Sequence, residues 1–195
     1  LRPLIERQRE QVVNARKQIQ NPVAVKLENL GAGINSRFPE YTPLITADES
    51  RLYFTSRRFS NWGQGKEDDL PYEDVYYCIR NSDGSWSSPA NVGPPINTEF
   101  HDATVALTAD GQKLWIYRTE GFYEVQIKGR KFMEPQYVGS PIETKEHEPS
   151  ASLSPDQRIL YFAREIYEEG HYDLFYSQKQ SNGKWSEPLR LPSTI

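Results

Sequence analysis

The chain has 195 residues with a net charge of -4, four tryptophans, twelve tyrosines and one cysteine. The net negative charge disfavours binding to nucleic acid phosphates or anionic lipids, and a single cysteine excludes an internal disulfide. No apolar run approaches the roughly 20 residues that a membrane-spanning helix needs, so the composition favours a folded unit of short, aromatic-rich strands.

The first predicted element is a helix. Apolar residues recur at intervals of three or four between charged ones, and Asn21-Pro22 ends the pattern. The next segment shows the alternation of a strand, at Val23, Val25 and Leu27. The sequence therefore predicts a helical linker over residues 1–22 and a second region over residues 23–195.

One pattern then occurs three times. In each copy an Ile precedes an acidic residue by six positions, an Asp by fourteen and a Leu by eighteen. These positions hold Ile34, Glu40, Asp48 and Leu52, then Ile96, Asp102, Asp110 and Leu114, then Ile142, Glu148, Asp156 and Leu160. Each copy ends with an aromatic residue three positions before a proline. Repeats of this length indicate propellers, solenoids or arrays.

Each copy is predicted to contain four short antiparallel strands, which is the content of a propeller blade. The blades are expected at about residues 31–92, 93–138 and 139–191, and a further repeat starts at 192–195. Since an isolated blade leaves two apolar faces uncovered, the blades are expected to stack around an axis. The predicted fold class is all-β: three propeller blades, about half of a ring, preceded by a short α-helix.

The pattern "INS...EYTPLITADESRLYFTSRR...EDVYYCIRNSDGSWSSPANVGPPINT" resembles the TolB-type, WD40-like propeller repeat. It is most similar to the version in multidomain, outer-membrane-associated proteins of Gram-negative bacteria, some of which belong to type IX secretion and gliding systems. In that family a tetratricopeptide region precedes a propeller of about six blades, and an OmpA-like domain commonly follows it.

The resemblance implies a periplasmic, outer-membrane-associated location and protein partners in an assembly there. It also implies that the helix ends a tetratricopeptide-like region. Peptidoglycan binding is expected only through domains absent from this chain, because no OmpA-like pattern occurs in it.

An Asp occupies the turn between the first two strands of each copy. An Asp side chain can accept hydrogen bonds from backbone N–H groups two residues ahead and so fix a turn. We therefore assign a structural role to Asp48, Asp110 and Asp156.

A second set of charges recurs at one end of the strands. An acidic residue begins each first strand and an Arg ends each second strand, so both are expected at the same end of the sheet. The acids are Glu40, Asp102 and Glu148, and the arginines are Arg57, Arg118 and Arg164. Two interpretations are open: pairs that keep the blades in register, or a ring at the channel mouth that faces a ligand.

The longest loop combines exposed aromatics with an acidic run. Its candidate partner-binding residues are Phe59, Trp62, Glu67, Asp68 and Asp69. The loop could equally be an insertion without a binding role. His101 and His147 each precede a repeated acid, but they lie on different predicted blades, so we expect no metal site.

No catalytic motif or cofactor-binding motif is apparent, and Cys78 lies within a predicted strand. The sequence thus favours a protein-interaction scaffold that is not an enzyme and binds no cofactor and no nucleic acid. The alternatives are a propeller that binds or hydrolyses glycans, and a propeller that controls substrate access to a peptidase domain.

Overall fold

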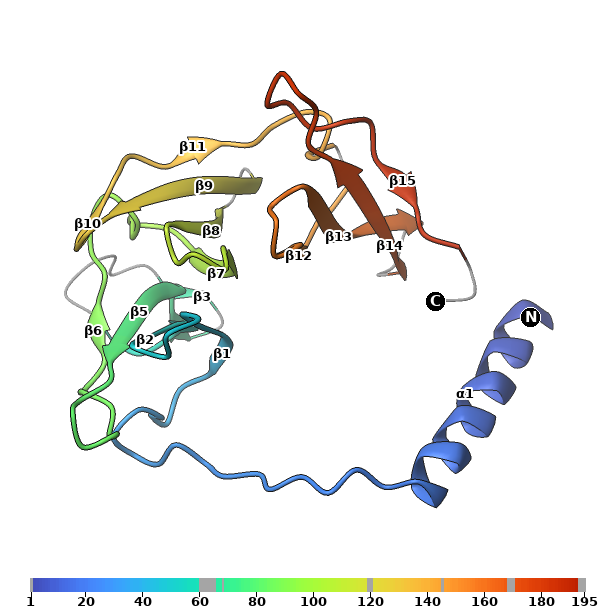
Figure 1. Ribbon diagram of the computed structural model, residues 1–195, viewed down its shortest axis with the longest axis horizontal. Coiled ribbons are helices and arrows are strands. Elements are labelled where there is room, and N and C mark those ends of the chain that lie inside the picture. Colours follow the sequence, from blue (N-terminus) through green and yellow to red (C-terminus); the bar gives the residue numbers. More distant parts are fainter. Residues whose placement is uncertain are drawn as a thin grey trace. The chain divides into compact units, whose positions relative to one another are not determined.

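The computed structural model describes residues 2–59, 66–67, 69–118, 121–144, 146–167 and 171–192. It divides the chain into two units, Leu1–Leu30 and Gly31–Ile195. The first unit contains the one helix, α1 (Arg2–Gln20), which Figure 1 shows in blue. Within the described part of the chain, no helix has the length and apolarity to cross a bilayer.

The helix ends where the sequence predicts. The backbone N–H of Asn21 donates to the carbonyl of Lys17 at 3.1 Å, and its side-chain Nδ2 donates to the same oxygen at 3.1 Å. The strand predicted after Pro22 is not formed, and Val23, Val25 and Leu27 are 81%, 72% and 92% exposed. A single extended segment without a hydrogen-bonding neighbour has nothing to stabilise it as a strand.

The second unit consists of antiparallel sheets, three of which follow the repeats. Sheet 1 contains β1 (Glu40–Ile45), β2 (Arg51–Ser56), β5 (Asp74–Ile79) and β6 (Ala90–Asn91). Sheet 2 contains β7 (Asp102–Leu107), β8 (Lys113–Arg118), β9 (Gly121–Lys128), β10 (Lys131–Phe132) and β11 (Gln136–Tyr137). Sheet 3 contains β12 (Ser150–Leu153), β13 (Ile159–Tyr167), β14 (His171–Gln178) and β15 (Leu189–Arg190).

A two-stranded ribbon, β3 (Lys66–Glu67) and β4 (Leu70–Pro71), branches from the connection between β2 and β5. The predicted all-β class with a preceding helix is confirmed at this level. The three sheets fall within the residue ranges predicted for the three repeats.

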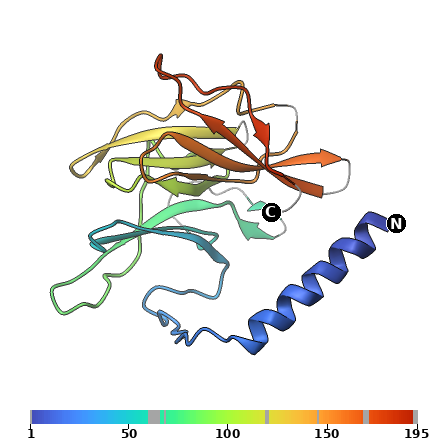
Figure 2. The same cartoon turned by 45° about the vertical axis from the view of Figure 1, so that its right-hand side comes forward.

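The first strands of the three sheets lie next to one another. β7 lies beside both β1 and β12, and the later strands of each sheet extend away from them (Figures 1 and 2). Thr104 on β7 connects sheets 1 and 2, because its Oγ1 donates to the carbonyl of Thr42 at 2.9 Å and its N–H donates to Thr55 Oγ1 at 2.8 Å. Within the described residues the sheets do not close into a ring.

Two apolar interfaces hold the three sheets together. We call the interface of sheets 1 and 2 junction A, and that of sheets 2 and 3 junction B. The repeated Ile inserts into each of them: Ile96 lies in junction A and Ile142 in junction B, and both are fully buried. Each buried side chain of this size stabilises the fold by about 1.5–3 kcal/mol, so the junctions explain why the repeats stack.

The two outer faces of the stack differ from the junctions. On sheet 1, Ile34 packs with its own sheet in a third cluster that includes Leu52 and Phe54. On sheet 3, Tyr161 and Leu174 are 40% and 47% exposed, although their counterparts in sheets 1 and 2 are buried. The buried counterparts are Tyr53, Val75, Trp115 and Phe122. Sheet 3 therefore presents an apolar face of the kind that the next sheet covers at both junctions.

Candidate functional site

The repeated acid and Arg form a buried clamp in sheets 2 and 3. Arg118 Nε lies 2.7 Å from Asp102 Oδ1, and Arg164 Nε lies 2.7 Å from Glu148 Oε1. In both sheets the same guanidinium donates to the carbonyl of the inserted isoleucine, Ile96 or Ile142, at 2.7 Å. Each clamp thus ties the loop that carries this isoleucine to the end of its own sheet.

In sheet 1 a different Arg completes the clamp. Arg58 Nη2 lies 2.9 Å from Glu40 Oε1 and donates to the carbonyl of Ile34 at 2.7 Å. The predicted residue, Arg57, instead donates to the carbonyls of Pro71 and Leu70. The register explains this: Ser56 occupies the place of Arg118 and Arg164, and residues two apart share a strand face. Arg58 therefore replaces the missing guanidinium, and Arg57 points the other way.

Burial shows what the clamps do. The side chain of Asp102 has no exposed surface, and burial raises the pKa of its carboxyl despite the opposing bonds from Thr98 and Arg118. For Glu40, burial raises the pKa, but hydrogen bonds from Ser36 and Ser56 outweigh it, so the net pKa is lowered. The clamp carboxylates thus accept hydrogen bonds from groups of their own repeat and hold the sheet ends together.

The repeated Asp fixes the first turn of each sheet. Thr46 Oγ1 donates to Asp48 Oδ1 at 2.6 Å, and the N–H of Ser50 donates to the same oxygen at 3.0 Å. These bonds lower the pKa of Asp48 to about 2, the bond from Thr46 foremost. The hydroxyls of Thr108 and Ser154 make the same contact with Asp110 and Asp156.

The long acidic loop is described only in part. Phe59 is 58% exposed, and its ring meets that of Phe38 edge-on with 5.4 Å between the centroids. Glu67 ends β3, and Asp69 lies in the turn before β4 with a φ of 61°. Trp62 and Asp68 lie outside the described residues. The loop's role in partner binding therefore stays a prediction.

The two histidines lie at separate junctions. His101 Nδ1 lies 3.0 Å from Glu73 Oε2, and His147 Nδ1 lies 3.0 Å from the hydroxyl of Tyr172. In the part of the chain that the structure describes, no three His, Cys, Asp or Glu side chains come close enough together to hold a metal ion.

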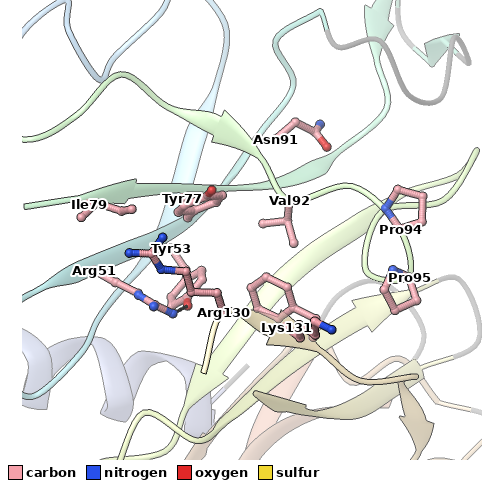
Figure 3. A pocket seen from close by; sticks show the side chains of 11 residues that line it. Arg51, Tyr53, Tyr77, Ile79, Asn91, Val92, Pro94, Pro95, Arg130 and Lys131 are labelled. Carbon is pink, nitrogen blue, oxygen red and sulfur yellow. Dashed lines mark hydrogen bonds between the residues drawn. The ribbon is translucent and has the colours of Figure 1, made fainter. Parts of the chain in front are cut away.

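A pocket of about 400 Å³ opens at junction A (Figure 3). Its walls come from the second and third strands of sheet 1, the loop around Pro94 and Pro95, and the turn between β9 and β10. The apolar part of the lining consists of Tyr53, Tyr77, Ile79, Val92 and Phe132. Tyr53 and Phe132 meet edge-on at 6.1 Å.

Three cationic side chains line the same pocket: Arg51, Arg130 and Lys131. In the view of Figure 3, Arg51 and Arg130 extend toward one end, and the Lys131 side chain extends toward Pro95. Arg51 Nη1 lies 3.3 Å from the carbonyl of Gly129, and none of the three cations forms an ion pair with a described residue. No carboxylate is among the lining residues, so the pocket carries uncompensated positive charge in a chain of net charge -4.

The equivalent place at junction B contains an ion pair. Lys113 replaces Arg51 and Glu124 replaces Tyr77, and Lys113 Nζ lies 2.8 Å from Glu124 Oε1. Trp185 packs there on Trp115 with 6.1 Å between the ring centroids. The comparison identifies the junction A pocket as the place where the repeat departs from its own pattern.

Sequence reasoning did not find this pocket, because its residues lie on two repeats and carry no motif. A signal was nevertheless present. When the repeats are aligned on Leu52 and Leu114, a basic residue precedes each Leu, but only the second repeat has an acid, Glu124, at the position that Tyr77 holds in the first.

No family model and no curated protein matches this sequence. Among solved structures, the chain is similar to "Dihydro-heme d1 dehydrogenase NirN in complex with DHE", with 14% sequence identity and a TM-score of 0.43. The match covers 77% of this chain and 27% of that chain, so the chain spans about a quarter of that protein's length.

The protein in this match is an enzyme, which contradicts the prediction that the chain is not an enzyme. That prediction is withdrawn. Because identity and TM-score are both low, the match assigns no reaction, substrate or cofactor to the chain.

Proposed function

We propose that the chain is part of a β-propeller that binds protein partners through the junction A pocket. Stacked four-stranded sheets with adjacent first strands are what propeller blades require. The open apolar face of sheet 3, at Tyr161 and Leu174, supports further blades beyond the three described. The observation that carries the binding role is the pocket itself, where three cations that form no ion pair with any described residue lie beside aromatic side chains.

The proposed location is the periplasm, in an outer-membrane-associated assembly such as a secretion machinery. This part rests on the resemblance of the repeats to TolB-type propellers. Cell fractionation of the parent protein, followed by identification of what cross-links to it, would test the location separately from the binding role.

A peptide library displayed on phage tests the binding role. The chain should enrich a set of peptides that an Arg51→Glu/Lys131→Glu variant does not retain, because charge reversal at the pocket repels an anionic partner. A glycan array run in parallel tests the alternative class. Tight binding to saccharides, with no enriched peptide, would replace the protein-binding proposal by a glycan-binding one.

A further inference from the structure

The chemistry of the junction A pocket specifies its ligand more closely, provided that the proposed protein-binding role holds. We propose that the pocket binds a carboxylate carried by an extended peptide that places an aromatic or aliphatic side chain beside it. The carboxylate belongs either to an Asp or Glu side chain or to a peptide C-terminus, and both have the same contacts available here.

The charge distribution supports a carboxylate. Arg51 and Arg130 present planar guanidinium groups, which match a carboxylate with two parallel hydrogen bonds, and Lys131 adds a third positive charge. These cations attract an anionic ligand, because no carboxylate lines the pocket to offset their charge. A long polyanion is disfavoured, because the chain as a whole has a net charge of -4 and repels it.

The apolar lining supports a peptide over a bare anion. Tyr77 and Phe132, which are only partly buried, give the pocket an aromatic side that a small inorganic anion would leave exposed to water. The pocket also opens beside β6, which is the edge strand of sheet 1. An extended peptide can lie along such an edge and place alternate side chains on one face.

Blocked peptides provide the test. The first peptide carries Phe and Glu two residues apart, acetylated and amidated, so that both side chains lie on one face when it is extended. The second replaces Glu with Gln, and the third keeps Gln but has a free C-terminal carboxylate. Fluorescence anisotropy of labelled peptides is measured with the wild-type chain and with Arg51→Met, Lys131→Met and Lys113→Met variants.

The Glu peptide or the free-terminus peptide should bind. The peptide without either carboxylate should bind at least about 10-fold more weakly, since a hydrogen bond to a charged group contributes roughly 1.5–3 kcal/mol. Arg51→Met and Lys131→Met should each weaken binding. Lys113→Met removes the same charge at junction B and should leave binding unchanged. Which of the two peptides binds identifies the source of the carboxylate.

Equal binding of all three peptides, or affinity unaffected by both pocket variants, would overturn the carboxylate proposal. So would the absence of binding by all three peptides. This outcome is distinct from failure of the proposed function: peptides enriched from the library that still bind Arg51→Met and Lys131→Met would preserve the protein-binding role and place it elsewhere on the surface.

Discussion

Junctions A and B are built from the same parts, yet they differ at two places. Both bury a loop isoleucine between two sheets, and both place an aromatic from the second strand, Tyr53 or Trp115, under the next sheet. At the outer place, junction A has the pocket with its three cations, whereas junction B has the ion pair of Lys113 and Glu124. An edge-on aromatic contact at 6.1 Å, Tyr53–Phe132 or Trp115–Trp185, occurs at both. The common parts maintain the stack, so the places that differ are where a specific role can reside.

The second difference lies near the inserted isoleucine. At junction A, Asn97 Oδ1 accepts from the N–H of Val75 at 2.9 Å, and its Nδ2 donates to the carbonyl of Val75 at 2.9 Å. At junction B, Glu143 occupies the same position, and its Oε1 accepts from the N–H of Phe122 at 2.6 Å. A neutral amide satisfies junction A at every pH, whereas junction B depends on the charge of a carboxyl.

The largest expected effect comes from emptying junction B. Trp115 is 1% exposed and packs on Phe122 and Trp185. Replacing Trp115 by Ala removes a large buried ring and should lower the free energy of unfolding by about 3–5 kcal/mol. Urea denaturation followed by circular dichroism measures this. Phe132→Ala at junction A should cost less, because Phe132 is only partly buried. An equal loss would show that partial burial does not limit what this ring contributes.

Giving junction A the ion pair of junction B should weaken ligand binding at the pocket. Tyr77→Glu places a carboxylate where Glu124 stands in sheet 2, within reach of Arg51, as Glu124 is of Lys113. The new pair offsets the charge of Arg51, and affinity for the carboxylate peptide should fall about 10-fold or more. Tyr77→Phe adds no charge to the site and should retain binding. Full affinity in the Tyr77→Glu variant would mean that the cations of the pocket do not select the ligand.

The sequence predicts the parts that repetition specifies. The isoleucines, the clamp acids and the turn aspartates each occur three times, and the structure shows them in equivalent places. The Arg57 assignment failed because the position that aligns with Arg118 and Arg164 is Ser56, and the guanidinium comes two residues after it, at Arg58. Spacing alone does not reveal which residues share a strand face. The pocket was missed for the opposite reason: it depends on what one repeat lacks, and on a turn supplied by its neighbour.

The pH dependence of stability should distinguish the junctions. Burial, with a smaller contribution from Glu148 nearby, raises the pKa of Glu143 from the ordinary 4.5 of a glutamate to about 7, although the hydrogen bond from the N–H of Phe122 and the charge of Arg164 act in the opposite direction. The folded state therefore holds this proton more tightly than the unfolded chain does. Its contribution to stability is fully present below pH 4.5 and is lost as the pH rises through 7.

Glu143→Gln should remove this part of the pH dependence, so that stability becomes flatter between pH 4.5 and 7 than in the wild type. Thermal unfolding at a series of pH values measures the change. Asn97→Asp introduces a carboxyl at junction A and should add a pH dependence of the same sign. If the profiles of wild type and Glu143→Gln coincide over this range, the carboxyl of Glu143 does not titrate with folding.

The smallest expected effect is that of the ion pair at junction B. The side chains of Lys113 and Glu124 are 23% and 24% exposed, so water screens their attraction. A double-mutant cycle with Lys113→Met and Glu124→Gln should give a coupling free energy of about 0.2–1 kcal/mol that declines with added salt. The pair then contributes little to stability, and its main consequence is to neutralise the place that junction A leaves charged. A coupling free energy well above this range would mean that the fold requires the pair. Because no carboxylate holds the place of Glu124 beside Arg51, junction A would then be the weaker of the two interfaces.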